Sequence, residues 1–455
     1  MSNLSISDQI NFKYREYALY VLQSRGIPNF YDSLTPVQRI ILENSPGSFN
    51  KTIGLVGEVI RTGLYHHGDS SLSGAISKLA RPFGCSFQIL EGDGFFGSPV
   101  NPSPSAPRYT SVKINKGVKE IIQKHSDLNE SNEEGGHDWL HVEIPIGLLT
   151  HIIGIAVGYR TNILPRKLED IVEYLEGKNK ILKPHFKDFS GKIYKYENTE
   201  NVWLFESGFE SNSVKRTLRI FDLPPVMRYD SFMDKLVNKL EGLGLEYKLN
   251  NNSQSKCDVT LWFHKLQSKE FEALVPTIKK LTQILVKEDI VFIKDGSVAQ
   301  FDSVKEYLDS FKIHLETVRL KRLRKDLENF KYDLEFLEAK LKFLIFMSQK
   351  KRTNKEIEEF LQQFSPKISS RLAAIQIVKL SSDHIVETEK EIARIKKLIL
   401  ETQKLIKAQE AIVKKIGDFK IKRPKVLFSG SESSLPVSNG IEIYEIAEET
   451  EEIED

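Results

Sequence analysis

The segment NKTIGLVGEVIRTGLYHHGDSSLSGAISKLARPF, residues 50–83, decides how the first part of this chain folds. Apolar residues recur at helical spacing on both sides of HHGDSS, which predicts two short helices joined by a tight turn. Ser70 and Ser71 stand where the second helix should begin, and we expect them to cap it. A possible strand, CSFQIL at 85–90, and a glycine-rich loop follow. This order predicts a helix-turn-helix with a wing.

The flanking segments extend this unit in both directions. Residues 1–24 are expected to form a polar arm and then a helix, and VQRIILEN should be helical because it follows Pro36. We therefore assign residues 25–150 to a winged-helix domain. Between about 140 and 300, strand-like runs such as HVEIPIGLL and TLRIFDLPP alternate with helical runs such as DSFMDKLVNKLEGLG. This alternation is typical of a mixed α/β region, and we assign residues 151–300 to it.

Two long stripes of aliphatic residues mark residues 301–420. One stripe runs from Val304 to Leu344 and the other from Ile385 to Ile416, in steps of three and four. A compact interval separates them, so we predict a long antiparallel coiled coil with a small globular tip. Residues 421–455 are rich in Glu, and we expect a disordered acidic tail. The predicted fold class is α+β and multidomain.

Composition restricts the class of partner and the compartment. The chain has 455 residues and a formal net charge of +2, but the acidic tail hides a more basic remainder, which permits a polyanionic partner. The amino terminus lacks the apolar core of a signal peptide, and apolar runs stay short of the roughly 20 residues that cross a bilayer. We therefore expect a cytoplasmic protein with no membrane partner.

A nucleotide-binding site is disfavoured by the prolines near the glycine-rich loop. GDGFFG, residues 92–97, matches the dinucleotide fingerprint, but that site needs a helix to begin there. Pro99, Pro102 and Pro104 follow and prevent such a helix. The sequence also lacks the phosphate-binding loop pattern, so we predict no ATP site of that kind.

A metal site is also disfavoured. His137 and His141 are four residues apart, as zinc ligands on a helix would be, but the segment continues into VEIP, which should be extended. Cys85 and Cys257 are the only cysteines and have no metal-like spacing, which fits a reducing compartment. We predict no metal ligands in this chain.

Two polar clusters remain as candidates for chemistry. In SAPRYT, residues 105–110, Arg108 and Tyr109 could simply be an exposed cation and a locally packed ring. Alternatively, the Tyr hydroxyl is a nucleophile and the guanidinium neutralises the charge of the group it attacks. In YHHGDSS, the imidazoles and hydroxyls could lie on a solvated helix end or converge on a phosphate. The residues alone leave these alternatives open.

Six segments in fixed order resemble one family. IPNFYDSLTPVQRIIL, YHHGDSSL, LEGDGFFGS, APRYT, GIAVGYRTNILPRKL and LRIFDLPP occur as in the breakage–reunion part of type IIA DNA topoisomerases. The resemblance extends from about residue 15 to about residue 418. The adjacent histidines are similar to those of the eukaryotic and T-even bacteriophage enzymes, and the length is similar to that of phage-type medium subunits.

The resemblance implies a covalent mechanism. Tyr109 would attack a DNA phosphodiester and become linked to the 5′ phosphate, and Arg108 would stabilise the charge on the attacked phosphoryl group. Ile155 would be an apolar wedge that bends the gate duplex, unless it simply packs in the core. The remaining matched positions comprise two that contact the scissile phosphate, Arg39 and His67, and two further DNA-binding positions, His66 and Ser70.

The sequence departs from the family pattern at three places. DSLTP replaces DGLKP, so Thr35 stands where a Lys is common, and one phosphate contact is in doubt. GYRTN replaces GMATN, which changes the two residues before Thr161. Gly74 replaces the acidic residue that accompanies Ser70 in drug-sensitive relatives, so quinolone sensitivity is not expected.

The resemblance also implies a partner subunit. Cleavage in this family needs Mg²⁺ held by a Glu and an Asp-x-Asp cluster, and strand passage needs ATP; this sequence has neither pattern. Both cofactors are therefore expected on an ATPase and Mg²⁺-binding partner, in an assembly of two copies of each chain. Residues 151–300 would be the tower domain, and the tip would join the two copies at the exit gate. Relaxation and decatenation of double-stranded DNA are expected. The alternative is a non-enzymatic DNA-architectural protein that dimerises through its coiled coil.

Overall fold

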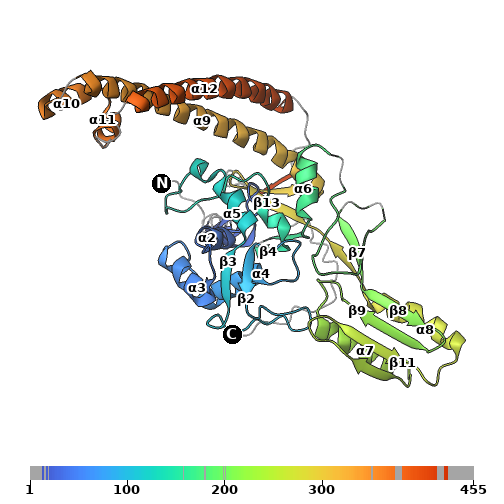
Figure 1. The fold of residues 1–455 in the computed structure, drawn as a ribbon. Helices are drawn as coiled ribbons and strands as arrows, with labels where there is room; N and C mark the ends of the chain where they lie inside the picture. Colours follow the sequence, from blue (N-terminus) through green and yellow to red (C-terminus); the bar gives the residue numbers. More distant parts are fainter. Residues whose placement is uncertain are drawn as a thin grey trace, which may run out of the picture. The chain divides into compact units, whose positions relative to one another are not determined.

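The computed structural model describes residues 13–14, 17–18, 20–156, 158–178, 181–197, 199, 201–349, 352–374, 382–417 and 425–428 (Figure 1). The chain divides into two compact units. The first comprises residues 1–311 and 422–455, and the second comprises residues 312–421.

The first unit begins with short helices near the amino terminus. They are η1 (Leu22–Gly26), α2 (Pro36–Glu43), α3 (Thr52–Arg61) and α4 (Asp69–Ala80). Helix α2 starts at Pro36 as predicted, because proline needs no N–H partner at a first helical position. The Thr35 N–H donates to Gln38 Oε1 at 3.0 Å and reinforces this start.

The predicted capping of α4 is wrong. Gly68 precedes the helix in an extended conformation and is its N-cap residue, whereas Ser70 and Ser71 lie inside the first turn. The extended backbone that defines an N-cap therefore falls two residues earlier than the serines. The helix continues to Ala80, and Leu72, Ile76 and Leu79 on its inner face are buried.

A three-stranded antiparallel sheet packs against these helices. Its order is β1 (Asn50–Lys51), β3 (Ser111–Ile114) and β2 (Leu90–Asp93). The strand expected over residues 85–90 begins only at Leu90, after a single bridge from Cys85 to Thr150. Val112 and Ile114 of β3 join the core of α4. Helices α5 (Lys116–Gln123) and η2 (Ser126–Leu128) follow.

The prediction of a strand over HVEIPIGLL is also wrong. Residues Ile146–Leu149 form the 3₁₀-helix η3, whose N-cap is Pro145, and all four are buried. Proline cannot donate to a sheet ladder, which accounts for the failure. A two-stranded antiparallel hairpin follows, β4 (Ile152–Ala156) and β5 (Tyr159–Ile163), and then α6 (Leu168–Leu175).

The region predicted as mixed α/β contains two further sheets. The first has the order β12 (Gln283–Lys287), β7 (Val202–Glu206) and β6 (Lys192–Lys195). The second has the order β10 (Lys248–Asn251), β11 (Asp258–Trp262), β9 (Thr217–Phe221) and β8 (Gly208–Asn212). Helices α7 (Tyr229–Gly242) and α8 (Ser268–Leu281) cover one face of the second sheet through a shared apolar core (Figure 1).

Another sheet of the first unit includes a strand from the segment that was expected to be a disordered tail. Strands β13 (Ile290–Lys294) and β14 (Ser297–Phe301) form a hairpin, and β15 (Lys425–Phe428) pairs with β14. The prediction of disorder from residue 421 is therefore wrong for residues 425–428. The rest of the predicted acidic tail lies outside the described residues.

The second unit is helical. It is built from most of α9 (Val304–Gln349), then α10 (Asn354–Leu361), α11 (Pro366–Ala373) and α12 (Ser382–Gly417). Glu338 pairs with Lys396 at 2.9 Å, and Glu316 accepts from Gln409 at 2.6 Å, so α9 and α12 run antiparallel, with α10 and α11 at one end (Figure 1). Within the part of the chain described, none of the helices has the length and apolar character needed to cross a membrane.

Candidate active site

The Arg108–Tyr109 pair lies on a turn that is anchored to the start of α3. The Tyr109 N–H donates to the Ala106 carbonyl at 2.9 Å, and Pro107 accepts from the Ile53 N–H at 3.2 Å. Buried Thr110 is bonded twice to Thr52: its carbonyl accepts from the Thr52 N–H at 3.0 Å, and the two hydroxyls are 2.8 Å apart. The loop thus satisfies N–H groups that the first turn of a helix leaves without intrahelical partners, which fixes the turn in place.

The side chains of this pair project away from the core. Tyr109 is 68% exposed, so its ring is not packed into the protein. The guanidinium carbon of Arg108 lies 5.3 Å from the centre of the Tyr109 ring, within the range of a cation–π contact. A phenol and a guanidinium are therefore held together and presented outward.

The glycine-rich loop before the turn contains no helix. Gly94 and Gly97 adopt φ values of +106° and +87°, and a side chain at Gly97 would overlap the backbone of Pro102. Phe96 is buried in the core and fixes the middle of the loop. GDGFFG therefore serves as a support for the Arg108–Tyr109 turn and has no helix start to hold a nucleotide.

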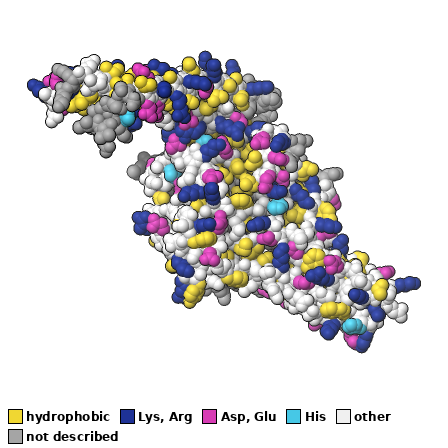
Figure 2. All heavy atoms as spheres, viewed as in Figure 1, with side chains coloured by type: hydrophobic (Ala, Val, Ile, Leu, Met, Phe, Trp, Pro, Cys, Tyr) yellow, Lys and Arg dark blue, Asp and Glu magenta, His cyan; other side chains and the backbone are white. Residues whose placement is uncertain are grey.

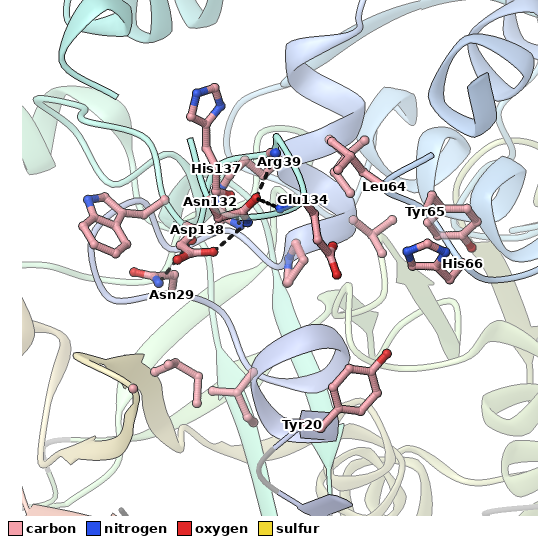
Figure 3. Close-up of a pocket in the computed structure, with 18 of the residues that line it drawn as sticks. Tyr20, Asn29, Arg39, Leu64, Tyr65, His66, Asn132, Glu134, His137 and Asp138 are labelled. Carbon is pink, nitrogen blue, oxygen red and sulfur yellow. Dashed lines mark hydrogen bonds between the residues drawn. The ribbon is translucent and has the colours of Figure 1, made fainter. Parts of the chain in front are cut away.

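Three other predicted residues meet in one pocket. Arg39, His66 and His67 line a pocket of about 570 Å³ in the first unit, and Figure 3 labels Arg39 and His66. Arg108 and Tyr109 are not among its lining residues. The structure therefore divides the predicted catalytic residues into two groups, one on the turn before β3 and one in this pocket.

Arg39 is buried and its charge is compensated. Its Nε and Nη2 donate to the two carboxylate oxygens of Asp32 at 2.7 and 3.1 Å, and Nη2 also donates to the Leu34 carbonyl at 3.1 Å. The Nη1 group donates at 3.5 Å to the carbonyl of His137, which also lines the pocket. The bidentate pair fixes the direction of the guanidinium.

Sequence reasoning missed Asp32, although it lies in the same motif, seven residues before Arg39. Its carboxylate also accepts from the backbone N–H of Leu34 and, at 3.0 Å, from that of Leu140, so the acidic side chain organises the wall of the pocket. The sequence signal that could have found it is an Asp shortly before a proline-initiated helix that carries an Arg.

The histidine segment forms another wall. His66 is exposed, His67 is partly buried, and the ring of Tyr65 meets the His67 ring edge-on at 5.5 Å. Tyr65 donates to the Gly68 carbonyl at 3.1 Å, and burial raises the pKa of its phenol. Ser70 is exposed in the first turn of α4, beyond this wall.

Acidic side chains also line the pocket. They belong to Glu134, Asp138 and Asp295, and the first two are labelled in Figure 3. Asp138 accepts from Asn132 at 2.9 Å, and His137 pairs with Glu43 at 2.5 Å. The pocket therefore combines donors for an anion with carboxylates that would repel one. On the face shown in Figure 2, basic and acidic side chains are likewise interspersed.

Ile155 lies apart from both groups, on the β4–β5 hairpin. It is 79% exposed, so the alternative that it simply packs in the core does not hold. Among the described residues there is no group of three or more His, Cys, Asp or Glu side chains arranged to hold a metal ion.

The sequence, compared over most of its length, places this chain in a known protein family. Residues 25–418 match the family model for the A subunit of DNA gyrase/topoisomerase IV, and the chain belongs to this family. The structure is similar to the crystal structure of the Plasmodium falciparum topoisomerase II DNA-binding, cleavage and re-ligation domain. The TM-score is 0.72 at 20% identity, over 89% of this chain and 63% of the other. The match confirms that the predicted α+β chain combines helices and sheets in one fold.

Curated relatives support the same family. The chain is 26% identical over 259 residues to the DNA topoisomerase medium subunit of Enterobacteria phage T4, which covers 54% of this chain and 57% of the relative. It is 34% identical over 219 residues to the DNA gyrase A subunit of Borreliella burgdorferi, which covers 42% of this chain and 27% of the relative. The chain thus spans little more than half the length of the phage relative and about a quarter of the gyrase protein.

Proposed function

We propose that this chain is the DNA-cleaving and rejoining subunit of an ATP-dependent type IIA DNA topoisomerase. One observation carries the proposal: the Tyr109 phenol is exposed on an anchored turn with the Arg108 guanidinium beside it. The exposed ring leaves the Tyr109 hydroxyl accessible to a DNA phosphate, and the adjacent guanidinium can neutralise the charge of that phosphate. Family membership supplies the class of reaction.

In the proposed reaction the Tyr109 oxygen attacks a backbone phosphorus and loses its proton. A bond forms between this oxygen and phosphorus, and the bond to the 3′ oxygen breaks, so a 3′ hydroxyl is released and a 5′ phosphotyrosyl ester remains. Arg108 stabilises the negative charge on the phosphoryl oxygens during the attack. Resealing is the reverse attack by the 3′ hydroxyl, and because the ester conserves the bond, this step needs no external energy.

The pocket residues would hold DNA close to the cleaved bond. Arg39 Nη1 and the His67 imidazole would contact the scissile phosphate, and His66 and Ser70 would contact neighbouring backbone groups. Residues 25–150 would act as a winged-helix cleavage domain. Ile155 would enter a base-pair step and bend the duplex, which costs a few kcal/mol of stacking that wider contact offsets.

The remaining requirements would be met by a partner. Enzymes of this family use ATP and Mg²⁺, and we propose that both bind to a partner subunit in a cytoplasmic assembly of two copies of each chain. The second unit would serve as the exit gate, with the α10–α11 tip joining the two copies. Its antiparallel helices α9 and α12 support this role because they carry the tip at one end of a long arm.

A cleavage-trapping assay tests the proposal. Supercoiled plasmid is incubated with this chain, Mg²⁺ and the partner subunit, and then denatured with detergent. We expect linear DNA with protein on its 5′ ends, and no adduct from Tyr109→Phe. Tyr194→Phe is the matched control because Tyr194 is 43% exposed on a strand of a different sheet, and it should form adducts at the wild-type level.

Two results would reject the proposal in different ways. Adducts that persist in Tyr109→Phe would show that another residue is the nucleophile. An uncut plasmid that is nevertheless bound and compacted by the wild-type assembly would favour the architectural alternative.

A further inference from the structure

The β4–β5 hairpin has two unlike faces. In its register Ile153 lies opposite Asn162, and Ile155 lies opposite Arg160, so these four side chains share one face. Ile153 and Ile155 are 52% and 79% exposed, and Arg160 is also exposed. The alternate residues turn inward.

The inner face is held firmly against the protein. A side chain at Gly154 would overlap the Gly26 carbonyl oxygen, so the hairpin and η1 touch through their backbones. Ala156 and Tyr159 pack on the apolar cluster that includes Leu22, Ile27 and Val291. A hairpin of two strands is marginal by itself, and this backing gives it a fixed position.

The ladder continues beyond the hairpin. Asn162 and Asp289 exchange backbone hydrogen bonds of 3.0 and 2.9 Å, which ties β5 to the segment that leads into β13. The outer face is therefore presented on a supported surface. A hairpin that bends a stiff ligand must itself be held rigidly, and this hairpin is.

Two exposed isoleucines on this face call for an explanation. Single exposed apolar residues are common on protein surfaces, but here two β-branched residues are adjacent on one face of a five-residue strand. Residues two apart on a strand are separated by about 6.6 Å, close to the rise of two base pairs of duplex DNA at about 3.4 Å each. Ile153 can therefore contact the duplex next to a step that Ile155 opens.

Arg160 adds a guanidinium to the same face, where it is ion-paired with Asp289. Its Nε donates to Asp289 Oδ2 at 2.6 Å, which uses one of the five N–H donors of a guanidinium. Side chains directly opposite on antiparallel strands have Cβ atoms about 5 Å apart, so Arg160 lies beside Ile155. The departure GYRTN thus has a structural explanation: Tyr159 fills the inner cluster and Arg160 joins the outer face.

We propose that Ile153 and Arg160 complete a DNA-bending surface with Ile155. Double-stranded DNA is the ligand: Ile153 packs against the sugars and base edges next to the opened step, and Arg160 binds a phosphate that flanks the bend. Asp289 orients the guanidinium. The inference rests on the proposed function, because the duplex bound by this hairpin is the one that the chain is proposed to cleave.

The test measures affinity and bending separately. The full chain carries Tyr109→Phe, so that no covalent adduct contributes, and is assembled with its partner subunit. A duplex labelled at both ends reports affinity between 50 and 200 mM salt, and end-to-end energy transfer reports the bend. Removal of one phosphate contact should lower the salt slope by about 0.9. The ratio of the wild-type affinity to the Arg160→Ala affinity should therefore fall by about 3.5-fold between 50 and 200 mM salt.

The variants have distinct expected results. Arg160→Lys should keep the wild-type salt slope, because the positive charge remains. Ile153→Ala should also keep the slope, but it should reduce the bend of the duplex. This reduction should be smaller than the one caused by Ile155→Ala. Val214→Ala and Arg324→Ala are the matched controls, because Val214 is 90% exposed on a turn and Arg324 is an exposed arginine paired with Glu410 in the second unit. Both controls should behave as wild type.

The inference is overturned if Arg160→Ala leaves the slope unchanged or Ile153→Ala leaves the bend unchanged. Loss of self-association or of partner binding in these variants, with slope and bend retained, would show that the face docks a protein instead. The same variants with Tyr109 intact are also tested for adduct formation, which reports on the nucleophile directly and so distinguishes failure of this inference from failure of the proposed function.

Discussion

The guanidinium of Arg39 is bound by both carboxylate oxygens of Asp32, and the two side chains are 3% and 0% exposed. A buried charge that loses its partner is costly, roughly 3–5 kcal/mol when one member of a pair is removed. The pair therefore has two roles: it stabilises the first unit and it aims Arg39 at the pocket.

Asp32→Asn should destabilise the first unit by roughly 3–5 kcal/mol, because Arg39 stays buried without a counter-charge. The urea midpoint of the first unit measures this. Glu58→Gln, which breaks the exposed Glu58–Arg61 pair, is the control and should hardly move the midpoint. An unchanged midpoint in Asp32→Asn would mean that water or another side chain compensates Arg39.

Arg108→Ala should slow DNA cleavage by on the order of 100-fold, the effect of losing one transition-state charge contact. Single-turnover cleavage at saturating protein isolates this step from binding. Arg219→Ala is the control, since Arg219 is an exposed, ion-paired arginine on a different sheet, and it should cleave at the wild-type rate. Cleavage by Arg108→Ala at full rate would remove Arg108 from the mechanism.

Local sequence signals predicted those elements whose determinants are local. Pro36 starts α2 because its ring fixes φ and needs no donor, and this is visible in the sequence. The start of α4 depended on the extended backbone of Gly68, and the serines that follow it drew the prediction two residues too late. Strand β15 pairs with β14, more than 100 residues earlier, and a non-local pairing of this kind leaves no local pattern.

At the site, too, some features could be predicted from local sequence and others depend on how the chain folds. The exposure of Tyr109 and Ile155 is consistent with the roles that the resemblance implied, but the Asp32–Arg39 pair is formed only when the chain folds. The sequence predicts a stripe of aliphatic residues along α12, but Thr388 and Thr402 of this helix are buried as well. Polar residues at such positions cannot be recognised from hydropathy alone.

Ser33→Gly should destabilise the first unit less than Ser33→Ala does. It is buried with φ at +59°, a conformation that a residue with a Cβ adopts at a cost of about 1 kcal/mol. Its hydroxyl lies 2.7 Å from that of Tyr307, so both variants lose this hydrogen bond. Ser33→Ala keeps the strain and Ser33→Gly releases it, so the urea midpoint of the Gly variant should be higher. The reverse order would show that the backbone here is not strained.

Protonation of Glu143 in acid should make the first unit less stable. The nearby His125 imidazole, at 3.5 Å, and the Lys124 ammonium, at 2.5 Å, lower the pKa of Glu143 from 4.5 to about 2. Because the folded pKa is depressed, the stabilisation is present above pH 4.5 and is lost as the pH falls toward 2. Glu143→Gln should therefore lower the melting temperature at pH 7, and its difference from wild type should shrink steadily below pH 4.5. Glu120→Gln, at an exposed carboxylate 3.9 Å from Lys116, should show no such convergence. A difference for Glu143→Gln that stays constant with pH would assign the effect to packing and not to charge.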